Sequence, residues 1–326
     1  MNRPLSKDSS VTARGLLKSI VLATVLSIAV FAVLSIYSDV RQLQANLAVF
    51  TYCSLAFAFL LASGNYGVRF IRWQYYLRHI DIIVPSGESA LVFLSGFVMS
   101  VTPGKFGEVF KSLLLYESRR ISIAKTAPIV VAERLTDLMA LVVLIALGSL
   151  SFKEGIPITI SGASVVALIL MACAFRPIGD FFLALFDKLP LTKRVGPKLR
   201  EAYNSLLEMT RLWPLLVGTV IGVVAWGMEC AALYVIVLGF GVSVLSWDAA
   251  TFAYSTSTMA GALAMMPGGL GVTEIGMAGL LRVLGGSEMT ISLATAATIL
   301  VRIATLWYAV VIGIIALGIR RILSKP

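Results

Sequence analysis

Hydrophobic positions form long runs along nearly the whole chain, and short polar stretches separate these runs. A run of about 20 apolar residues is long enough to cross the hydrocarbon core of a bilayer as a helix. We expect six transmembrane helices, at roughly residues 16–37, 46–68, 124–150, 158–175, 212–239 and 289–319. The pattern therefore predicts an all-α polytopic membrane protein.

Two further apolar stretches are interrupted by residues that break helices. These residues are Pro103, Gly104 and Gly107 in the first stretch, and Pro267, Gly268, Gly269 and Gly271 in the second. Proline lacks the backbone N–H of a helix, and glycine loses the most conformational entropy when it is fixed. Irregular backbone at membrane depth has to be buried in protein or line a watery cavity. We therefore expect two re-entrant broken-helix pairs, over about 86–117 and 246–284, at a binding site.

The polar segments predict how the chain is organised. Residues 1–14 resemble a cytoplasmic tail, and 15–326 form a single transmembrane domain. Residues 176–211 show apolar positions at helical spacing among basic residues, which favours an interfacial linker. An ordinary solvated loop is the alternative for that segment. With both broken pairs re-entrant, most of the 27 Lys and Arg residues fall on one side, so both termini are predicted to be cytoplasmic.

The same topology predicts an internal repeat. Residues 46–150 would enter from outside and insert their broken pair from the cytoplasm, whereas residues 212–319 would do the reverse. The two segments would then be inverted copies, which is typical of transporters that work by alternating access.

Composition excludes several classes of protein. Apolar residues make up 58% of the chain, charged residues make up 13%, and the mean hydropathy is +0.92. No soluble domain has this composition, so the net charge of +10 reflects where basic residues sit beside the bilayer and does not indicate nucleic acid. The three cysteines lie in apolar runs and the one histidine is His79. We therefore expect no metal or other cofactor.

Charged residues within the predicted membrane region are the main candidates for function. Glu108 and Glu274 follow the two helix breaks, and Arg134 and Arg302 follow the breaks at similar distances. Each such charge costs roughly 2.5–3.5 kcal/mol at the bilayer centre unless it is paired or hydrated. We interpret these four residues as substrate-binding, whereas a buried lattice of ion pairs that clamps the repeats together is the structural alternative.

Three more charges accompany the first break. Glu133 and Asp137 share the helix of Arg134, and for them the lattice and the binding site both stay open. Lys105 lies within the break, where free N–H groups of a following half-helix would favour phosphate. Gly269 stands at the matching position of the second break, so the cavity should be electrically lopsided.

Cations at the end of the second predicted span are weaker candidates. Arg69 and Arg72, with Trp73 and Tyr76, could bind an anionic headgroup. The sequence favours a simpler interpretation, in which they are interfacial anchors that extend toward water. Glu229 is a lone acid in the 212–239 span, to which the sequence assigns no role.

Four blocks of sequence carry a family resemblance: residues 69–73 (RFIRW), 102–108 (TPGKFGE), 133–137 (ERLTD) and 267–274 (PGGLGVTE). They resemble the lysylphosphatidylglycerol synthase transmembrane-domain family, which contains flippase-like integral membrane proteins of bacteria and archaea. The resemblance implies an inverted-repeat domain that moves an anionic or modified phospholipid between leaflets. Family members that make lysylphosphatidylglycerol carry a soluble aminoacyl-transfer domain after the membrane part. The chain is expected to be a stand-alone member that does not aminoacylate lipids, and a polyprenyl-phosphate-linked lipid is left open as cargo.

The expected function is a lipid transporter in the bacterial cytoplasmic (inner) membrane that is not an enzyme. No G-x-x-x-x-G-K-[ST] pattern occurs, so ATP hydrolysis is not expected. The expected partners are membrane lipids, with a separate lipid-modifying synthase and homo-oligomers left open, and no nucleic acid. One alternative is a membrane enzyme such as a lipid-phosphate glycosyltransferase. Another is a scaffold subunit for a separate lipid synthase.

Overall fold

The computed structural model of the 326-residue chain describes residues 40–102, 107–151, 155–174, 176–177 and 196–323, with positions 25, 29, 30 and 33. Within these residues the regular structure is helical and no strand occurs, which confirms the predicted all-α class. The first predicted span, 16–37, lies largely outside the described residues. Pro103, Gly104 and Lys105 also lie outside them.

The helices of the first half follow the predicted order. They are α2 (Val40–Val49), α3 (Tyr52–His79), α4 (Ser86–Ser95), the 3₁₀ turn η1 (Gly96–Met99), α5 (Phe110–Arg119), α6 (Ile123–Gly148), the 3₁₀ turn η3 (Ser149–Ser151) and α7 (Gly155–Ala174). The pair formed by α4–η1 and α5 corresponds to the first predicted broken pair.

The second half begins after the described part of the linker. Its elements are α9 (Gly196–Met209), α10 (Leu212–Gly239), α11 (Trp247–Leu263), the 3₁₀ turn η5 (Pro267–Gly269), α12 (Val272–Leu284), α13 (Ile291–Arg302), the π-helical turn η6 (Ile303–Trp307) and α14 (Tyr308–Leu323). Helices α11 and α12 correspond to the second predicted broken pair.

Four helical segments in the described part of the chain are long and apolar enough to cross a membrane. They are Tyr52–His79, Gly155–Cys173, Leu212–Gly239 and Ile291–Leu323. Helix α6 has 26 residues and a comparable length, but Glu133, Arg134 and Asp137 interrupt its apolar sequence. The chain is therefore an integral membrane protein with spanning helices, whereas the count of six crossings stays a prediction.

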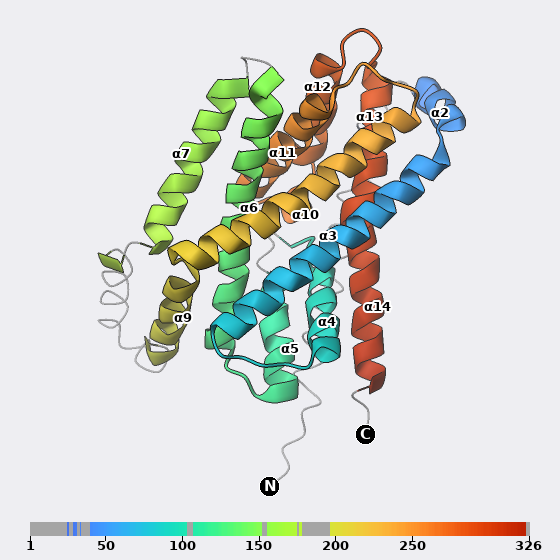
Figure 1. Cartoon of the computed structure of the whole chain (residues 1–326). Coiled ribbons are helices and arrows are strands. Elements are labelled where there is room, and N and C mark those ends of the chain that lie inside the picture. Colours follow the sequence, from blue (N-terminus) through green and yellow to red (C-terminus); the bar gives the residue numbers. More distant parts are fainter. Residues whose placement is uncertain are drawn as a thin grey trace.

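Helices α3 and α10 lie side by side and cross the molecule diagonally (Figure 1). The Asn65 side-chain amide of α3 donates a 2.7 Å hydrogen bond to the Ala225 carbonyl of α10. Gly222 lets α10 approach its neighbours, because a β-carbon there would lie 3.0 Å from the Ala140 β-carbon of α6. Small residues and interhelical hydrogen bonds are the usual means by which membrane helices pack closely.

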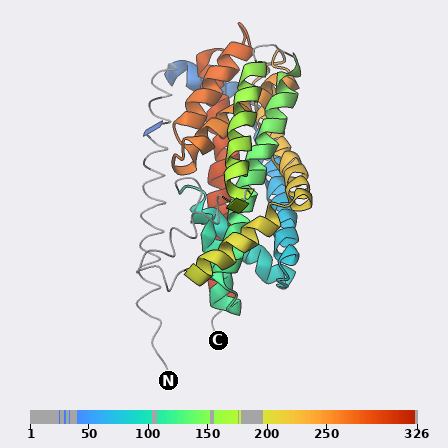
Figure 2. The same cartoon turned by 90° about the vertical axis from the view of Figure 1, so that its left-hand side faces the viewer.

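The two broken pairs lie toward opposite ends of the molecule: α4 and α5 in the lower half, and α11 and α12 in the upper half (Figure 1). Figure 2 shows the same separation from the side. This placement is what insertion from opposite membrane faces requires, and the inverted-repeat relation itself stays a prediction. The C-terminal ends of α3, α5 and α14 share the lower end, and their last turns carry basic residues.

The backbone at the second break adopts positive φ angles at its three glycines. Gly268, Gly269 and Gly271 have φ angles of 62°, 73° and 87°, in the left-handed region that residues with a β-carbon disfavour. Gly261 of α11 lies so close to the turn that an added β-carbon would be 3.2 Å from the Gly269 α-carbon. The Pro-Gly sequence thus ends α11 and folds the chain back into α12, as predicted.

The described ends of the first break are joined through one hydroxyl group. Thr102 Oγ1 donates a 2.6 Å hydrogen bond to the Met99 carbonyl and accepts a 3.0 Å hydrogen bond from the Gly107 N–H. Thr102 thus supplies hydrogen-bond partners for one backbone group before the break and one after it. These groups would otherwise lack a partner where the helix ends.

Both boundaries of the second predicted span, 46–68, differ in the structure, where α3 begins at Tyr52 after the separate helix α2. Helix α3 does not end near residue 68 but continues to His79, because its central arginines find partners inside the protein. In the predicted 176–211 linker, α9 packs against α6, where the Ser122 hydroxyl donates a 3.2 Å hydrogen bond to Glu201. The interfacial position of that linker stays a prediction.

Candidate functional site

A cavity of about 380 Å³ lies among α3, α6, α7, α10 and the second broken pair. Its charged and hydroxyl-bearing lining includes Tyr66, Arg69, Arg134, Asp137, Glu229, Tyr254 and Arg302. Most of the remaining wall is apolar, including Leu138, Leu141, Ile169, Met265 and Met266. One cavity therefore offers both buried charge and an apolar wall, the two surfaces that an amphipathic ligand needs.

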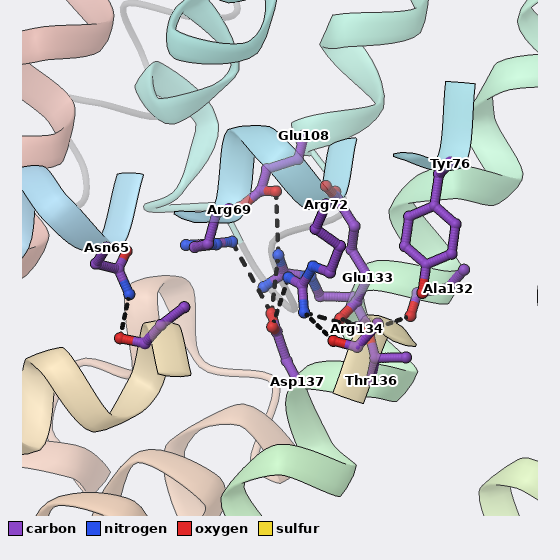
Figure 3. A network of polar contacts seen from close by, with 12 residues as sticks. Asn65, Arg69, Arg72, Tyr76, Glu108, Ala132, Glu133, Arg134, Thr136 and Asp137 are labelled. Carbon is purple, nitrogen blue, oxygen red and sulfur yellow. Dashed lines mark hydrogen bonds and ion pairs between the residues drawn. The ribbon is translucent and has the colours of Figure 1, made fainter. Parts of the chain in front are cut away.

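Asp137 of α6 gathers three arginines (Figure 3). Its Oδ1 accepts a 2.7 Å hydrogen bond from Arg72 Nη2, and its Oδ2 lies 3.2 Å from Arg134 Nη2 and 3.9 Å from Arg69 Nη2. Arg69 and Arg72 are three residues apart on α3, as are Arg134 and Asp137 on α6, so each pair shares a helix face. The crossing of α3 and α6 brings the two faces together.

Glu108 extends this set of ion pairs to the first broken pair. Its Oε2 lies 3.2 Å from Arg134 Nη2 and 3.7 Å from Lys111 Nζ, and Lys111 in turn donates a 2.6 Å bond to Glu133. The Lys111 ammonium also sits 4.6 Å from the centroid of the Trp73 ring, a cation–π contact. We call the seven residues Arg69, Arg72, Lys111, Arg134, Glu108, Glu133 and Asp137 the first charge cluster.

The first charge cluster contains one more cation than carboxylates. The side chains of all its members are at most 8% exposed except that of Arg134, which is 19% exposed. Among the described residues, no hydrogen-bond partner is present for the Nε atoms of Arg69 and Arg134. An excess positive charge at low dielectric, next to unused donors, attracts an anion strongly.

The second break has a smaller arrangement of the same kind. Arg302 Nε donates a 2.6 Å hydrogen bond to Glu274 Oε1, and Arg302 Nη2 donates another of 2.6 Å to the Gly268 carbonyl. Glu274 Oε2 accepts a 2.6 Å bond from the Gly271 N–H at the start of α12. We call Glu274 and Arg302 the second charge pair. A carboxylate in the first turn of a helix also meets the positive end of the helix dipole.

The sequence matched Glu108 with Glu274 and Arg134 with Arg302, and in the structure each carboxylate pairs with the arginine of its own half. Glu108 pairs with Arg134, and Glu274 pairs with Arg302, each carboxylate following a break and each arginine coming from a later helix. Both arginines line the cavity, whereas neither carboxylate does. The two carboxylates lie behind the arginines and hold them in place.

The interpretation of Arg69 and Arg72 as interfacial anchors is wrong. Arg69 is 7% exposed and Arg72 is fully buried, because Asp137 on a different helix supplies their partner. Lys111 was missed altogether, since its place after the first break made it resemble a cytoplasmic cation. Its spacing three residues after Glu108, on the same side of a helix, was the available signal. Lys105 lies outside the described residues.

Glu229, which the sequence left without a role, lies at the cavity beside aromatic hydroxyls. It is 6% exposed and accepts a hydrogen bond from the Tyr254 hydroxyl of α11. Tyr66 of α3 lines the same cavity and donates a 3.0 Å hydrogen bond to the Thr305 carbonyl in η6. π-Helical turns such as η6 often occur at functional sites. Among the described residues, no group of three or more His, Cys, Asp or Glu side chains could hold a metal ion.

Comparison with known proteins identifies relatives of this chain. A family model described as "Lysylphosphatidylglycerol synthase TM region" matches residues 20–313. A UPF0104 membrane protein of Methanocaldococcus jannaschii is 27% identical over 71% of this chain and 97% of the relative. A UPF0104 membrane protein of Pyrococcus horikoshii is 24% identical over 78% of this chain and 83% of the relative. The match to the family model spans both broken pairs, the first charge cluster and the second charge pair.

Proposed function

The chain belongs to the lysylphosphatidylglycerol synthase transmembrane-region family, and from that premise we propose that it carries an anionic lipid between the two leaflets of a membrane. The cargo is an anionic or modified phospholipid, or a polyprenyl-phosphate-linked lipid. The transport proceeds without ATP hydrolysis, and the protein is a transporter rather than an enzyme. Its membrane is the bacterial cytoplasmic membrane, with both termini on the cytoplasmic side.

The observation that carries the proposal is a cavity whose lining combines charged and apolar side chains. The first charge cluster holds an excess cation, and Arg69 and Arg134 bring unused Nε donors to it. A phosphate group would bring negative charge and acceptor oxygens to these donors. The apolar wall formed by Leu138, Ile169 and Met265 would receive the hydrocarbon part of the same molecule.

Movement between leaflets would use the two broken pairs. The two pairs lie toward opposite ends of the molecule. Residues of both halves of the chain line the cavity. If each pair opens in turn while the other stays closed, the headgroup is exposed first to one membrane face and then to the other. In this scheme the ion pairs Glu108–Arg134 and Glu274–Arg302 tie the two breaks to the cavity.

The test is lipid movement in proteoliposomes made with the purified full-length chain. Fluorescently labelled phosphatidylglycerol, polyprenyl phosphate and phosphatidylcholine are incorporated, and a membrane-impermeant reductant reports the fraction in the outer leaflet over time. We expect faster exchange of an anionic lipid than in protein-free vesicles, with little effect on phosphatidylcholine. Unchanged exchange of both anionic lipids would contradict the proposal.

A matched pair of variants makes the test specific to the cavity. Arg134→Gln removes a cavity cation, whereas Arg119→Gln removes a cation that pairs with Glu88 on an exposed surface. We expect Arg134→Gln to lose at least tenfold of the exchange rate, since about 1.4 kcal/mol of lost interaction is a factor of ten. Arg119→Gln should match the wild type. Equal loss in both variants would point to net charge rather than to the cavity.

A further inference from the structure

Glu229 is a buried acid at the cavity that the proposed transport of a headgroup does not itself use. It is the one charged residue of α10, a helix of 28 residues, and its side chain faces the cavity that Arg69, Arg134 and Arg302 also line. An ionisable side chain inside a membrane segment is costly to keep there, and such residues commonly bind ions or protons.

The groups around Glu229 come from six helices, including α10 itself. The Tyr254 hydroxyl of α11 donates a hydrogen bond to the Glu229 carboxylate. Tyr66 and Arg69 of α3 lie close enough to Glu229 to interact with it electrostatically. The other charged and titratable groups that share this environment are Arg134 and Asp137 of α6, Arg302 of α13, Cys173 of α7 and Cys230 of α10. Each of these arginines has a carboxylate partner of its own within 4.0 Å.

We infer that Glu229 is a proton-binding site and that a proton is taken up together with the anionic lipid. The inference rests on the proposed function. A phosphate at Arg69 and Arg134 would share a cavity of about 380 Å³ with the Glu229 carboxylate. The two negative charges repel each other at low dielectric, and a proton on the carboxylate removes this repulsion. The step adds one proton to one carboxylate oxygen, and no other bond changes.

The contact with Tyr254 links this protonation to the second broken pair. An ionised carboxylate can only accept the hydroxyl hydrogen of Tyr254, whereas a protonated carboxyl group can also donate one. Tyr254 belongs to α11, the helix that ends at the second break. A change of proton occupancy therefore changes how firmly α10 holds the helix leading into that break.

The experiment measures whether lipid binding takes up protons. Short-chain dihexanoylphosphatidylglycerol is titrated into the purified full-length chain by calorimetry, in buffers that differ in their enthalpy of ionisation. The dependence of the binding heat on the buffer gives the number of protons taken up with each lipid. We expect uptake by the wild type, and binding without uptake by Glu229→Gln, which keeps the shape and the acceptor oxygen for Tyr254.

The control is Glu88→Gln, which changes an acid paired with Arg119 on the exposed surface and should show the uptake of the wild type. Binding by the wild type with no buffer dependence would overturn the inference and leave the proposed function standing. Absence of binding by the wild type would overturn both. Uptake by Glu229→Gln equal to that of the wild type would overturn the assignment to Glu229.

A second variant keeps the inference testable if Glu229→Gln does not fold. Tyr254→Phe retains the carboxylate and removes the hydroxyl group that bonds to it. We expect this variant to take up protons with a shifted dependence on pH, because it removes the hydroxyl that bonds directly to the carboxylate. A pH dependence identical to that of the wild type would overturn the inference.

Discussion

The first charge cluster and the second charge pair both provide partners for buried charged side chains, but they differ in the number of partners. In the first, Asp137 contacts three arginines, and Arg134 contacts two carboxylates. In the second, Glu274 has Arg302 as its one ion-pair partner among the described residues, and backbone groups of the break complete the arrangement. In the first charge cluster, loss of Arg134 leaves every carboxylate with an ion-pair partner. In the second charge pair, the two side chains bond to each other and to the backbone of the turn.

This difference suggests different roles for the two breaks. The second pair fixes backbone, because Arg302 bonds to the Gly268 carbonyl and Glu274 bonds to the Gly271 N–H. The first cluster has an extra cation and an arginine that is partly exposed to the cavity. We therefore expect substitutions at the second pair to act mainly on folding, and substitutions at the cavity side of the first cluster to act mainly on the ligand.

The largest expected effect is that of Arg302→Gln. It leaves Glu274 fully buried without its cationic partner, and removal of one member of a buried ion pair costs about 3–5 kcal/mol. It also removes the donor to the Gly268 carbonyl. Thermal unfolding in detergent should show a large drop in the transition temperature.

The double variant Arg302→Gln with Glu274→Gln tests the cause of that drop. Neutralising the stranded carboxylate should recover a large part of the lost stability, because the desolvated charge is then gone. A double variant no more stable than Arg302→Gln would show that the bond to the Gly268 carbonyl, rather than the charge on Glu274, is what matters.

Arg134→Gln should affect stability less than the same change at Arg302. Asp137 keeps Arg69 and Arg72, and Glu108 keeps Lys111, so no carboxylate is left alone. We expect the free energy of unfolding to fall by about 1.5–3 kcal/mol, the usual net value of a hydrogen bond to a charged group. The same purified variant should be deficient in lipid exchange. A loss of stability equal to that of Arg302→Gln would remove the contrast between the two regions.

Sequence reasoning succeeded where the information is local. Pro267 and its glycines dictate a break whatever surrounds them, and Glu108 and Glu274 each follow a break within a few residues. The sequence also required that buried charges be paired or hydrated, and the structure shows which pairs form, Glu108–Arg134 and Glu274–Arg302.

Sequence reasoning failed where the partner lies on a distant helix. Arg69 and Arg72 resemble interfacial anchors because aromatic residues surround them, and only the crossing of α3 and α6 shows that Asp137 holds them. Lys111 has the same difficulty, because its partner Glu133 comes from another helix. The cavity position of Glu229 depends on several helices packed together, which no single stretch of sequence encodes.

The smallest expected effect is that of Arg119→Gln, and it defines the baseline for the comparison. Arg119 bonds to Glu88 at 2.6 Å, which is as short as the bond between Arg302 and Glu274. The Arg119 side chain is 44% exposed, however, so water and salt screen its charge in both the folded and the unfolded state. Its unfolding temperature and its lipid exchange should match the wild type at low and at high salt. A clear loss of stability in this variant would show that contact distance alone, without burial, accounts for the effects expected at Arg302 and Arg134.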